Sequence, residues 1–202
     1  MAEKFRLIAL AGGSASGKTT LVRAVRALMT VAVLDQDAYC RDLSALHPAD
    51  RQAVNFDAPE AVDLVRLEED AKRLCAGESV AAPCYDFVSH TRMSRTVPVF
   101  PEPVIILTGL HVCWLTLCER RALNVYLHTP DRERFRRRLI RDIAERGRTE
   151  EEVRERWLRW VLPMHHCWVA PQQVRADLVL SGMDPPEKNA RRMLALLGGE
   201  QS

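Results

Sequence analysis

The sequence predicts a single α/β domain, residues 1–202, built on a five-stranded parallel sheet flanked by helices. Three observations support this fold class. Five short apolar segments fit buried strands, helical segments alternate with them, and neither a repeat nor a low-complexity linker divides the chain. Alternating strands and helices favour parallel pairing with helices on both faces. A length of 202 residues suits one domain with a real core and would be cramped for two.

The first elements follow from local spacing. Residues 5–11 form an apolar run that ends in glycines, which predicts a buried parallel strand. Residues 19–29 have helical spacing, and residues 31–34 predict the second strand. Residues 35–59 are polar with weak periodicity and predict a loop with short helical pieces. An amphipathic helix is predicted at 61–76.

The middle of the chain predicts a β-hairpin. Residues 80–84 and 95–100 are rich in β-forming side chains, and a turn-like segment at 89–94 lies between them. Pro83 and Pro98 cannot donate ladder hydrogen bonds. We therefore expect this hairpin at an edge of the main sheet or as an excursion from it.

The second half supplies the remaining strands, at 104–107, 123–127 and 177–180. A final helix is predicted at 187–197, and residues 198–202 are expected to fray.

Two helices in this half have sequence signals at their ends. Thr129 and Pro130 predict the N-cap and first position of a helix that stops at Gly147. Thr149 and Glu152 form a capping-box pattern for the next helix.

Composition and charge exclude several classes of function. A net charge of +2 predicts no general affinity for nucleic acid or a membrane surface. No apolar run approaches the length of a transmembrane helix. The six cysteines form no C-x-x-C pair, and no secretory signal precedes them, so we expect reduced thiols in a cytoplasmic protein.

The segment after the first strand matches the phosphate-binding pattern G-x-x-x-x-G-K-[ST]. Its residues are Gly12, Gly13, Ser14, Ala15, Ser16, Gly17, Lys18 and Thr19. Glycines let backbone N–H groups surround a phosphate chain without Cβ clashes, and the following helix turns its positive end toward the same anion. Lys18 adds a charge on the β- and γ-phosphates, and the hydroxyl of Thr19 is a ligand for Mg²⁺.

The alternative to a phosphate loop is a chance glycine-rich turn. A strand before the segment and a helix that begins at Thr19 after it favour the phosphate loop. Thr20, the next residue of this helix, is also predicted to bind the nucleotide. The pattern therefore predicts a P-loop NTPase that binds ATP or GTP with Mg²⁺. It does not specify which reaction follows.

The basic residues are unevenly distributed. They comprise four lysines and 25 arginines, and eight of the arginines lie between residues 132 and 148. This density predicts either a solvated helix face or an anion-binding surface.

Five further motifs follow the phosphate loop in order. They are L-D-Q-D at 34–37, N-F-D-A-P-E-A at 55–61, Y-D-F-V-S-H at 85–90, R-D-I-A-E-R-G-R at 141–148 and V-L-P-M-H at 161–165. In this order and spacing the chain resembles the uridine–cytidine kinase family over residues 6–180. The third and fourth motifs are much more specific than the phosphate loop.

The resemblance implies both a fold and an activity. It implies a hairpin insertion at 80–100 over the nucleoside, a helical lid at 138–150 over the ATP phosphates, and a homotetramer. The implied reaction is ATP-dependent phosphorylation of the 5′-hydroxyl of uridine or cytidine, giving UMP or CMP in pyrimidine salvage.

The resemblance assigns the catalytic and metal-binding roles. Asp37 is implied to be the catalytic base and a neighbour of Mg²⁺, with Thr19 as the other metal ligand and Lys18 on the phosphates. A carboxylate at this edge of the sheet can accept the proton of an attacking hydroxyl. The alternative for Asp37 is a loop-capping role. Asp35 is a second acid nearby, and we expect it to be solvated.

The resemblance also assigns the nucleoside site. Phe56 and Asp57 match the ribose-side pair, and Asp57 would accept hydrogen bonds from the 2′- and 3′-hydroxyls. Tyr85, Phe87 and His90 match the base-recognition hairpin. There an aromatic face stacks on the pyrimidine, and His90 meets its 4-position edge. The alternatives are an N-cap role for Asp57 and core packing for the aromatic residues.

Four arginines are implied to surround the substrates and to stabilise charge on the transferring phosphoryl group. They are Arg138 and Arg148 for the nucleoside, Arg141 for catalysis and Arg146 for ATP. Gly147 would be the hinge of the lid. A solvated basic face is the alternative for these four, and it is the expectation for Arg132, Arg136 and Arg137.

The sequence departs from the family at the end of the third strand. The family has a Glu directly before Gly109, where it helps hold Mg²⁺ or its waters, and this chain has Thr108. Activity could persist on Thr19 and Asp37 with more metal-bound waters, or Asp35 could substitute. The third outcome is a weak or inactive nucleotide-binding paralogue. We favour the first.

Two smaller departures concern the choice of nucleoside. Cys40 replaces a usual aromatic residue near Asp37, and Arg156 replaces a usual Gln. Two rival functions also stay open. One is a P-loop kinase for another small alcohol, such as pantothenate or phosphoribulose, which should lack the Y-D-F-x-x-H hairpin. The other is a regulatory nucleotide-binding protein without catalysis, which Thr108 favours.

Overall fold

A computed structural model of the chain describes residues 6–117 and 122–198. Our expectations for Phe5 and for residues 199–202 concern positions outside these ranges. Within these ranges, none of the helices combines the length and apolar character that crossing a bilayer requires.

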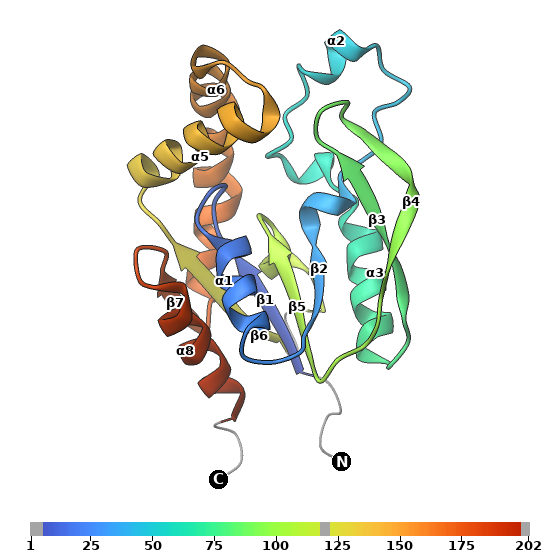
Figure 1. Cartoon of the computed structure of the whole chain (residues 1–202), viewed down its shortest axis with the longest axis vertical. Coiled ribbons are helices and arrows are strands. Elements are labelled where there is room, and N and C mark those ends of the chain that lie inside the picture. Colours follow the sequence, from blue (N-terminus) through green and yellow to red (C-terminus); the bar gives the residue numbers. More distant parts are fainter. Residues whose placement is uncertain (1–5, 118–121, 199–202) are drawn as a thin grey trace.

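The centre of the fold is a five-stranded sheet in the order β2-β5-β1-β6-β7 (Figure 1). Each neighbouring pair is parallel, which confirms the predicted fold class. The strands are β1 (Arg6–Ala11), β2 (Ala32–Asp35), β5 (Val104–Gly109), β6 (Ala122–His128) and β7 (Leu178–Ser181).

Side chains alternate between two apolar layers, one on each face of the sheet. On one face Leu7 and Ala9 of β1 pack in a cluster with Leu67 and Leu74. These two leucines belong to α3 (Leu64–Cys75). On the other face Ile8 and Leu10 pack with residues of α1 (Lys18–Arg26) and α8 (Pro186–Gly198). The near-continuous apolar strands follow from burial on both faces.

Four further α-helices occur in the described residues. They are α2 (Pro48–Arg51), α5 (Asp131–Arg146), α6 (Glu150–Arg156) and α7 (Leu162–Met164). The short 3-10 helices are η1 (Gln36–Tyr39), η2 (Pro59–Ala61), η3 (Val112–Trp114) and η6 (Ala170–Arg175). Two π-helical turns, η4 (Trp157–Val161) and η5 (His165–Val169), flank α7. Pro163 lies between them, and because it has no N–H it removes one α-helical hydrogen bond from this segment.

The predicted hairpin is present as a separate two-stranded antiparallel sheet. It consists of β3 (Val80–Asp86) and β4 (Thr91–Val99). The turn occupies residues 87–90, so its predicted position at 89–94 was wrong. Asp86 explains the difference, because its carboxylate accepts hydrogen bonds from the Val88 amide and the Ser89 hydroxyl. His90 completes the turn with a φ of 55°.

The ends of α5 were predicted partly correctly. Gly147 ends the helix in the left-handed conformation, as expected, and the Thr149–Glu152 capping box begins α6. The N-cap prediction for Thr129 was wrong. Its hydroxyl donates instead to the carbonyl of Ser16, 2.9 Å away, and so ties the phosphate loop to the start of α5.

Candidate active site

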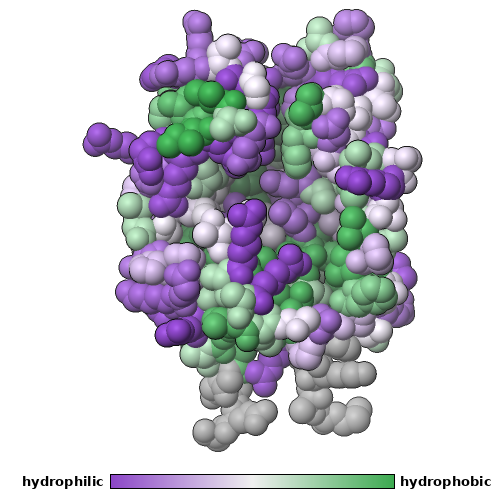
Figure 2. Space-filling model, viewed as in Figure 1, coloured by the Kyte–Doolittle hydropathy of each residue, from purple (hydrophilic) through white to green (hydrophobic). Residues whose placement is uncertain are grey.

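A cavity of about 680 Å³ lies at the carboxyl edge of the sheet. Its residues come from the phosphate loop, the end of β2, the segment around Asp57, the hairpin turn, α5 and the loop after β7. Figure 2 shows the hollow between the two upper lobes of the molecule. Since β1 pairs with β5 on one side and β6 on the other, the strand order reverses beside this position, where open α/β sheets bind ligands.

The phosphate loop has the geometry of an anion cradle. Gly17 has a φ of 106°, and α1 begins directly after it. The Lys18 ammonium donates to the carbonyls of Gly12 (2.8 Å) and Gly13 (3.1 Å). The hydroxyl of Ser16 is buried without a hydrogen-bond partner. An unpartnered buried hydroxyl and a helix N-terminus fit a bound phosphate chain.

All the predicted loop residues from Ser14 to Thr20 line the cavity. Gly12 and Gly13 are not among its lining residues, and Gly13 has a packing role that the sequence did not show. A Cβ at position 13 would lie 2.6 Å from Nη1 of Arg134, a fully buried side chain. Arg134 is held by Asp131 at 2.6 Å and by the ring of Trp157.

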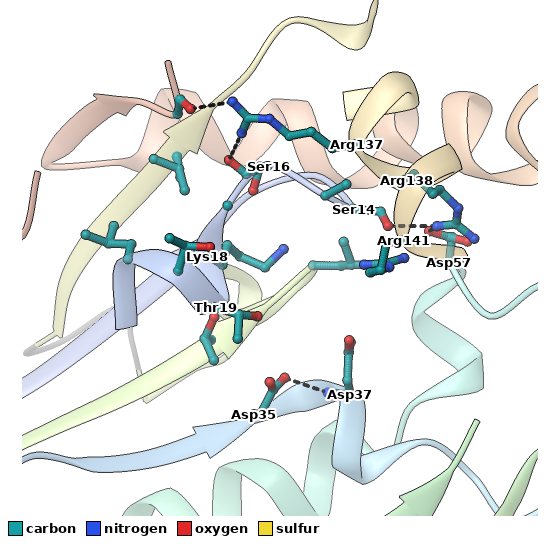
Figure 3. A pocket seen from close by; sticks show the side chains of 18 of the residues that line it. Ser14, Ser16, Lys18, Thr19, Asp35, Asp37, Asp57, Arg137, Arg138 and Arg141 are labelled. Carbon is teal, nitrogen blue, oxygen red and sulfur yellow. Dashed lines mark hydrogen bonds and ion pairs between the residues drawn. The ribbon is translucent and has the colours of Figure 1, made fainter. Parts of the chain in front are cut away.

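Two carboxylates project from the end of β2 toward Lys18 and Thr19 (Figure 3). The Asp37 amide donates to Oδ1 of Asp35 at 3.0 Å, which fixes the pair. The expectation that Asp35 is solvated was wrong, because it is half-buried and lines the cavity. Burial, and after it the charge of Asp37, raises the pKa of Asp35. Burial also lowers the pKa of Lys18, against the opposing effect of Asp37 and Asp35.

Thr108 lies next to Asp35 in the sheet. The two residues are direct partners in the β2–β5 ladder, and both line the cavity. Thr108 is 3% exposed, and its hydroxyl has no hydrogen-bond partner. The polar lining therefore continues from β2 across to β5 without an acid on β5.

The residues present fit a Mg²⁺ ion that arrives with a nucleotide. In the described part of the chain there is no group of three or more His, Cys, Asp or Glu side chains that could hold a metal by itself. Mg²⁺ usually takes one or two carboxylates and completes its shell with phosphates and waters. Thr19, Asp35 and Asp37 supply such a partial set at the phosphate loop.

Four predicted arginines converge on one buried carboxylate that sequence reasoning did not single out. Asp142 has no exposed surface. The four guanidinium groups that surround it, at 2.8–3.6 Å, belong to Arg138, Arg141, Arg146 and Arg148. Burial alone would raise the pKa of Asp142, but the charges of Arg138 and Arg141 more than offset this and lower it. The cluster therefore holds one carboxylate and excess positive charge at the cavity wall.

Arg137 also belongs to the cavity, so the prediction that it is solvated was wrong. Its guanidinium donates to the carbonyls of Ser16 (3.3 Å) and Gly182 (3.0 Å). The loop after β7 packs over that face of α5. This contact joins distant parts of the chain, so the position of Arg137 on its helix could not predict it. Arg132 and Arg136 are exposed, as expected.

The predicted nucleoside residues meet at the other end of the cavity. His90 stacks on Phe56 with a centroid separation of 4.5 Å, and Phe87 lines the same cavity. Arg138 connects the two ends, since it donates to Ser14 Oγ at 2.7 Å and lies 4.0 Å from Asp57. Tyr85 does not line this cavity. Its ring is 8% exposed and packs against the edge of Phe87.

Arg156 and Trp160 also line the cavity. The sequence marked Arg156 as unusual and gave no signal for Trp160, which required the position of the π-turn after α6. Arg156 lies over the Trp160 ring and donates to the carbonyl of Gln52 at 2.8 Å.

Acidification is expected to destabilise the fold through three buried histidines. Burial lowers the pKa of His90, His111 and His165 to about 4, below the usual value near 6.5. The unfolded chain therefore binds more protons between those values. Stability is lost as the pH falls from about 6.5, by roughly 1–2 kcal/mol per histidine at pH 5. The raised pKa of Asp35 acts in the opposite sense but involves one group.

Urea unfolding at pH 7.5 and 5.0 measures this loss. His90→Gln should reduce the difference in the free energy of unfolding between the two pH values by the contribution of one histidine. Replacing the exposed His128 by Gln should leave that difference unchanged. Equal pH dependence in both variants would contradict the role of buried His90.

Comparisons with known proteins agree with this geometry. Residues 7–186 match the model of the phosphoribulokinase/uridine kinase family. A protein from Chloroflexus aurantiacus named uridine kinase is 39% identical over 180 residues, covering 87% of this chain and 86% of its own. A uridine kinase from Deinococcus deserti is 39% identical over 186 residues, covering 89% and 90%. A solved structure, described as a possible uridine kinase from Bacillus stearothermophilus, shares the fold at a TM-score of 0.61 and 15% identity. It covers 89% of this chain and 90% of its own.

Proposed function

The chain belongs to the phosphoribulokinase/uridine kinase family, and on this basis we propose that it transfers the γ-phosphoryl group of ATP to the 5′-hydroxyl of uridine, and also of cytidine. One observation carries the proposal. A single cavity contains the phosphate loop, Asp37 and the nucleoside residues Phe56, Asp57 and His90. A nucleotide-binding protein without catalysis would not need a hydroxyl-acceptor site in the same cavity.

Asp37 is the group that we assign to the proton of the attacking hydroxyl. It is exposed within the cavity and lies near the charge of Lys18. A positioned carboxylate orients the hydroxyl and accepts its proton as the O–P bond forms. The Asp37 amide is held by Asp35, so the carboxylate needs little reorganisation.

The phosphates are bound by backbone amides of the loop, by Lys18 and by the arginines around Asp142. Guanidinium groups held in place before reaction stabilise charge on the transferring group. When bound, Mg²⁺ would neutralise charge on the β- and γ-phosphates, and Thr19 with Asp37 would help to hold it.

The nucleoside is assigned to the opposite end of the cavity. Asp57 accepts the ribose hydroxyls in this proposal, and Arg138 lies beside it. His90 has a pKa lowered to about 4, so it is neutral at pH 7 and has both a donor and an acceptor nitrogen. A neutral imidazole can meet either the 4-carbonyl of uracil or the 4-amino group of cytosine.

Several broader features belong to the same proposal. We propose a role in pyrimidine salvage, in the cytoplasm and without nucleic-acid or membrane partners. The cysteines that the structure describes are free thiols, which are typical of a reducing compartment. We also propose a homotetramer, by family resemblance, and sedimentation velocity would measure it. The segment 138–150 is proposed as a lid, with the left-handed Gly147 as its hinge.

A coupled ADP-release assay tests the function. It uses Mg²⁺-ATP with uridine, cytidine, 2′-deoxyuridine or no acceptor, and mass spectrometry identifies the product. We expect uridine to raise ADP release at least about tenfold over the control without acceptor. Loss of a hydrogen bond to the charged Asp57 should lower kcat/KM for 2′-deoxyuridine by about 10–100-fold. Turnover of pantothenate or a sugar phosphate, with none of uridine or cytidine, would contradict the proposal.

A further inference from the structure

The part of the cavity near Thr19 has an acid at the end of β2. The family resemblance places that acid on β5 instead. The resemblance implies a carboxylate at the end of β5, and this chain has Thr108 there. Asp35, at the end of β2, is the ladder partner of Thr108. Neighbouring strands are about 4.8 Å apart, so the two positions are close enough to act on the same ion or on its first water shell.

Alternation of side chains places Asp35 and Thr108 on the same face. Val31 and Val33 precede Asp35 at two-residue intervals, and Val104 and Ile106 precede Thr108 in the same way. All four of these apolar residues pack in the cluster that includes α1. Asp35 and Thr108 therefore continue the face on which α1 lies, and α1 begins beside Thr19. Figure 3 shows Asp35 and Thr19 facing the same space.

The unpartnered hydroxyl of Thr108 is an independent sign of a ligand at this position. Thr108 is 3% exposed, lines the cavity and has no hydrogen-bond partner for Oγ1. Leaving a buried hydroxyl unpaired destabilises a protein, so such groups usually have a partner. A water bound to Mg²⁺ would satisfy it, since a hydroxyl can accept one hydrogen bond and donate another.

We propose that Asp35 supplies the second carboxylate of the nucleotide-associated Mg²⁺ site, with Thr108 binding a metal-coordinated water in place of the missing acid. The inference depends on the proposed kinase function, because the metal arrives with ATP. The site thereby keeps the negative charge of a second carboxylate, which lies on β2 instead of on the neighbouring strand β5. Mg²⁺ retains several waters in protein sites, so this displacement needs no further ligand.

Metal affinity, measured without turnover, tests the proposal. Mn²⁺ replaces Mg²⁺ as the probe, and electron paramagnetic resonance reports Mn²⁺ bound to the complex of the full-length protein with the non-hydrolysable analogue AMP-PNP. Asp35→Asn should weaken Mn²⁺ binding by about 10–100-fold, while AMP-PNP affinity without metal is kept. Thr108→Val, which removes only the hydroxyl, should cause a smaller loss of about twofold to fivefold. Asp50→Asn is the matched control, because Asp50 is exposed on α2 and does not line the cavity.

A charge swap provides a second, independent outcome. The double variant Asp35→Asn/Thr108→Glu returns the carboxylate to β5 and should recover most of the lost Mn²⁺ affinity. Mn²⁺ binding by Asp35→Asn within twofold of Asp50→Asn would overturn the inference while leaving the kinase function intact. Failure of the unmodified protein to bind AMP-PNP with Mn²⁺ would overturn the proposed function as well.

Discussion

Replacing Asp37 by Asn is expected to lower kcat for uridine by about 10²–10⁴-fold, the range typical of general-base catalysis. Asn keeps the shape of the side chain and its position after β2, but it cannot accept the proton of the 5′-hydroxyl. ATP affinity should change by less than about threefold, because we propose that the phosphates are held mainly by the loop amides and by Lys18, which line the same cavity. Steady-state kinetics at saturating Mg²⁺ and isothermal calorimetry with AMP-PNP measure the two quantities.

Comparison with Asp35 separates a proton-acceptor role from a metal-binding role. Asp37→Asn should remain slow at any Mg²⁺ concentration, whereas Asp35→Asn should recover activity as Mg²⁺ is raised. Asp50→Asn provides the reference for an exposed Asp-to-Asn change. A kcat for Asp37→Asn within threefold of that reference would rule out Asp37 as the base.

Replacing Asp142 by Asn is expected to destabilise the protein by about 3–5 kcal/mol, the range seen when one partner of a buried ion pair is removed. The substitution preserves side-chain volume, yet it leaves the guanidinium groups around Asp142 without a compensating charge. Repulsion should also separate these arginines and raise KM for ATP. Urea unfolding and steady-state kinetics measure the effects.

A surface ion pair provides the matched control for Asp142. Glu150 contacts Arg154 at 2.7 Å on α6, and both side chains are more than half exposed. Glu150→Gln removes the same charge and should change stability little, because exposed pairs are screened by solvent. If Asp142→Asn were as mild as Glu150→Gln, the carboxylate would have no organising role for the arginines.

Local patterns were enough to predict the sheet and the phosphate loop. The strands are apolar runs buried on both faces, and the loop combines a strand, glycines and a helix within one short segment. The ion pairs of Asp142 could have been predicted in part, since it lies four residues from both Arg138 and Arg146 on one helix. Arg148 joins that cluster only because Gly147 turns the chain back, which spacing alone does not specify.

Contacts between distant segments accounted for the errors. The partnership of Asp35 with Thr108 depends on the β2–β5 register, which a strand prediction leaves open. The Arg137 guanidinium donates to the carbonyl of Gly182, which is 45 residues away in the sequence. The exception is Tyr85, which was expected at the cavity from its motif: it is 8% exposed, and its ring packs against the edge of Phe87, only two residues away.

In the proposed nucleoside site, the stack of His90 on Phe56 restricts how a pyrimidine can enter. At a centroid separation of 4.5 Å the two rings are already in contact, so no planar molecule fits between them. A base must rest against the outside of the pair or meet its rim. Because the two rings already pack against each other, they lose little torsional freedom on binding. Selectivity among nucleobases would then come from edge-on polar contacts more than from the thickness of a slot.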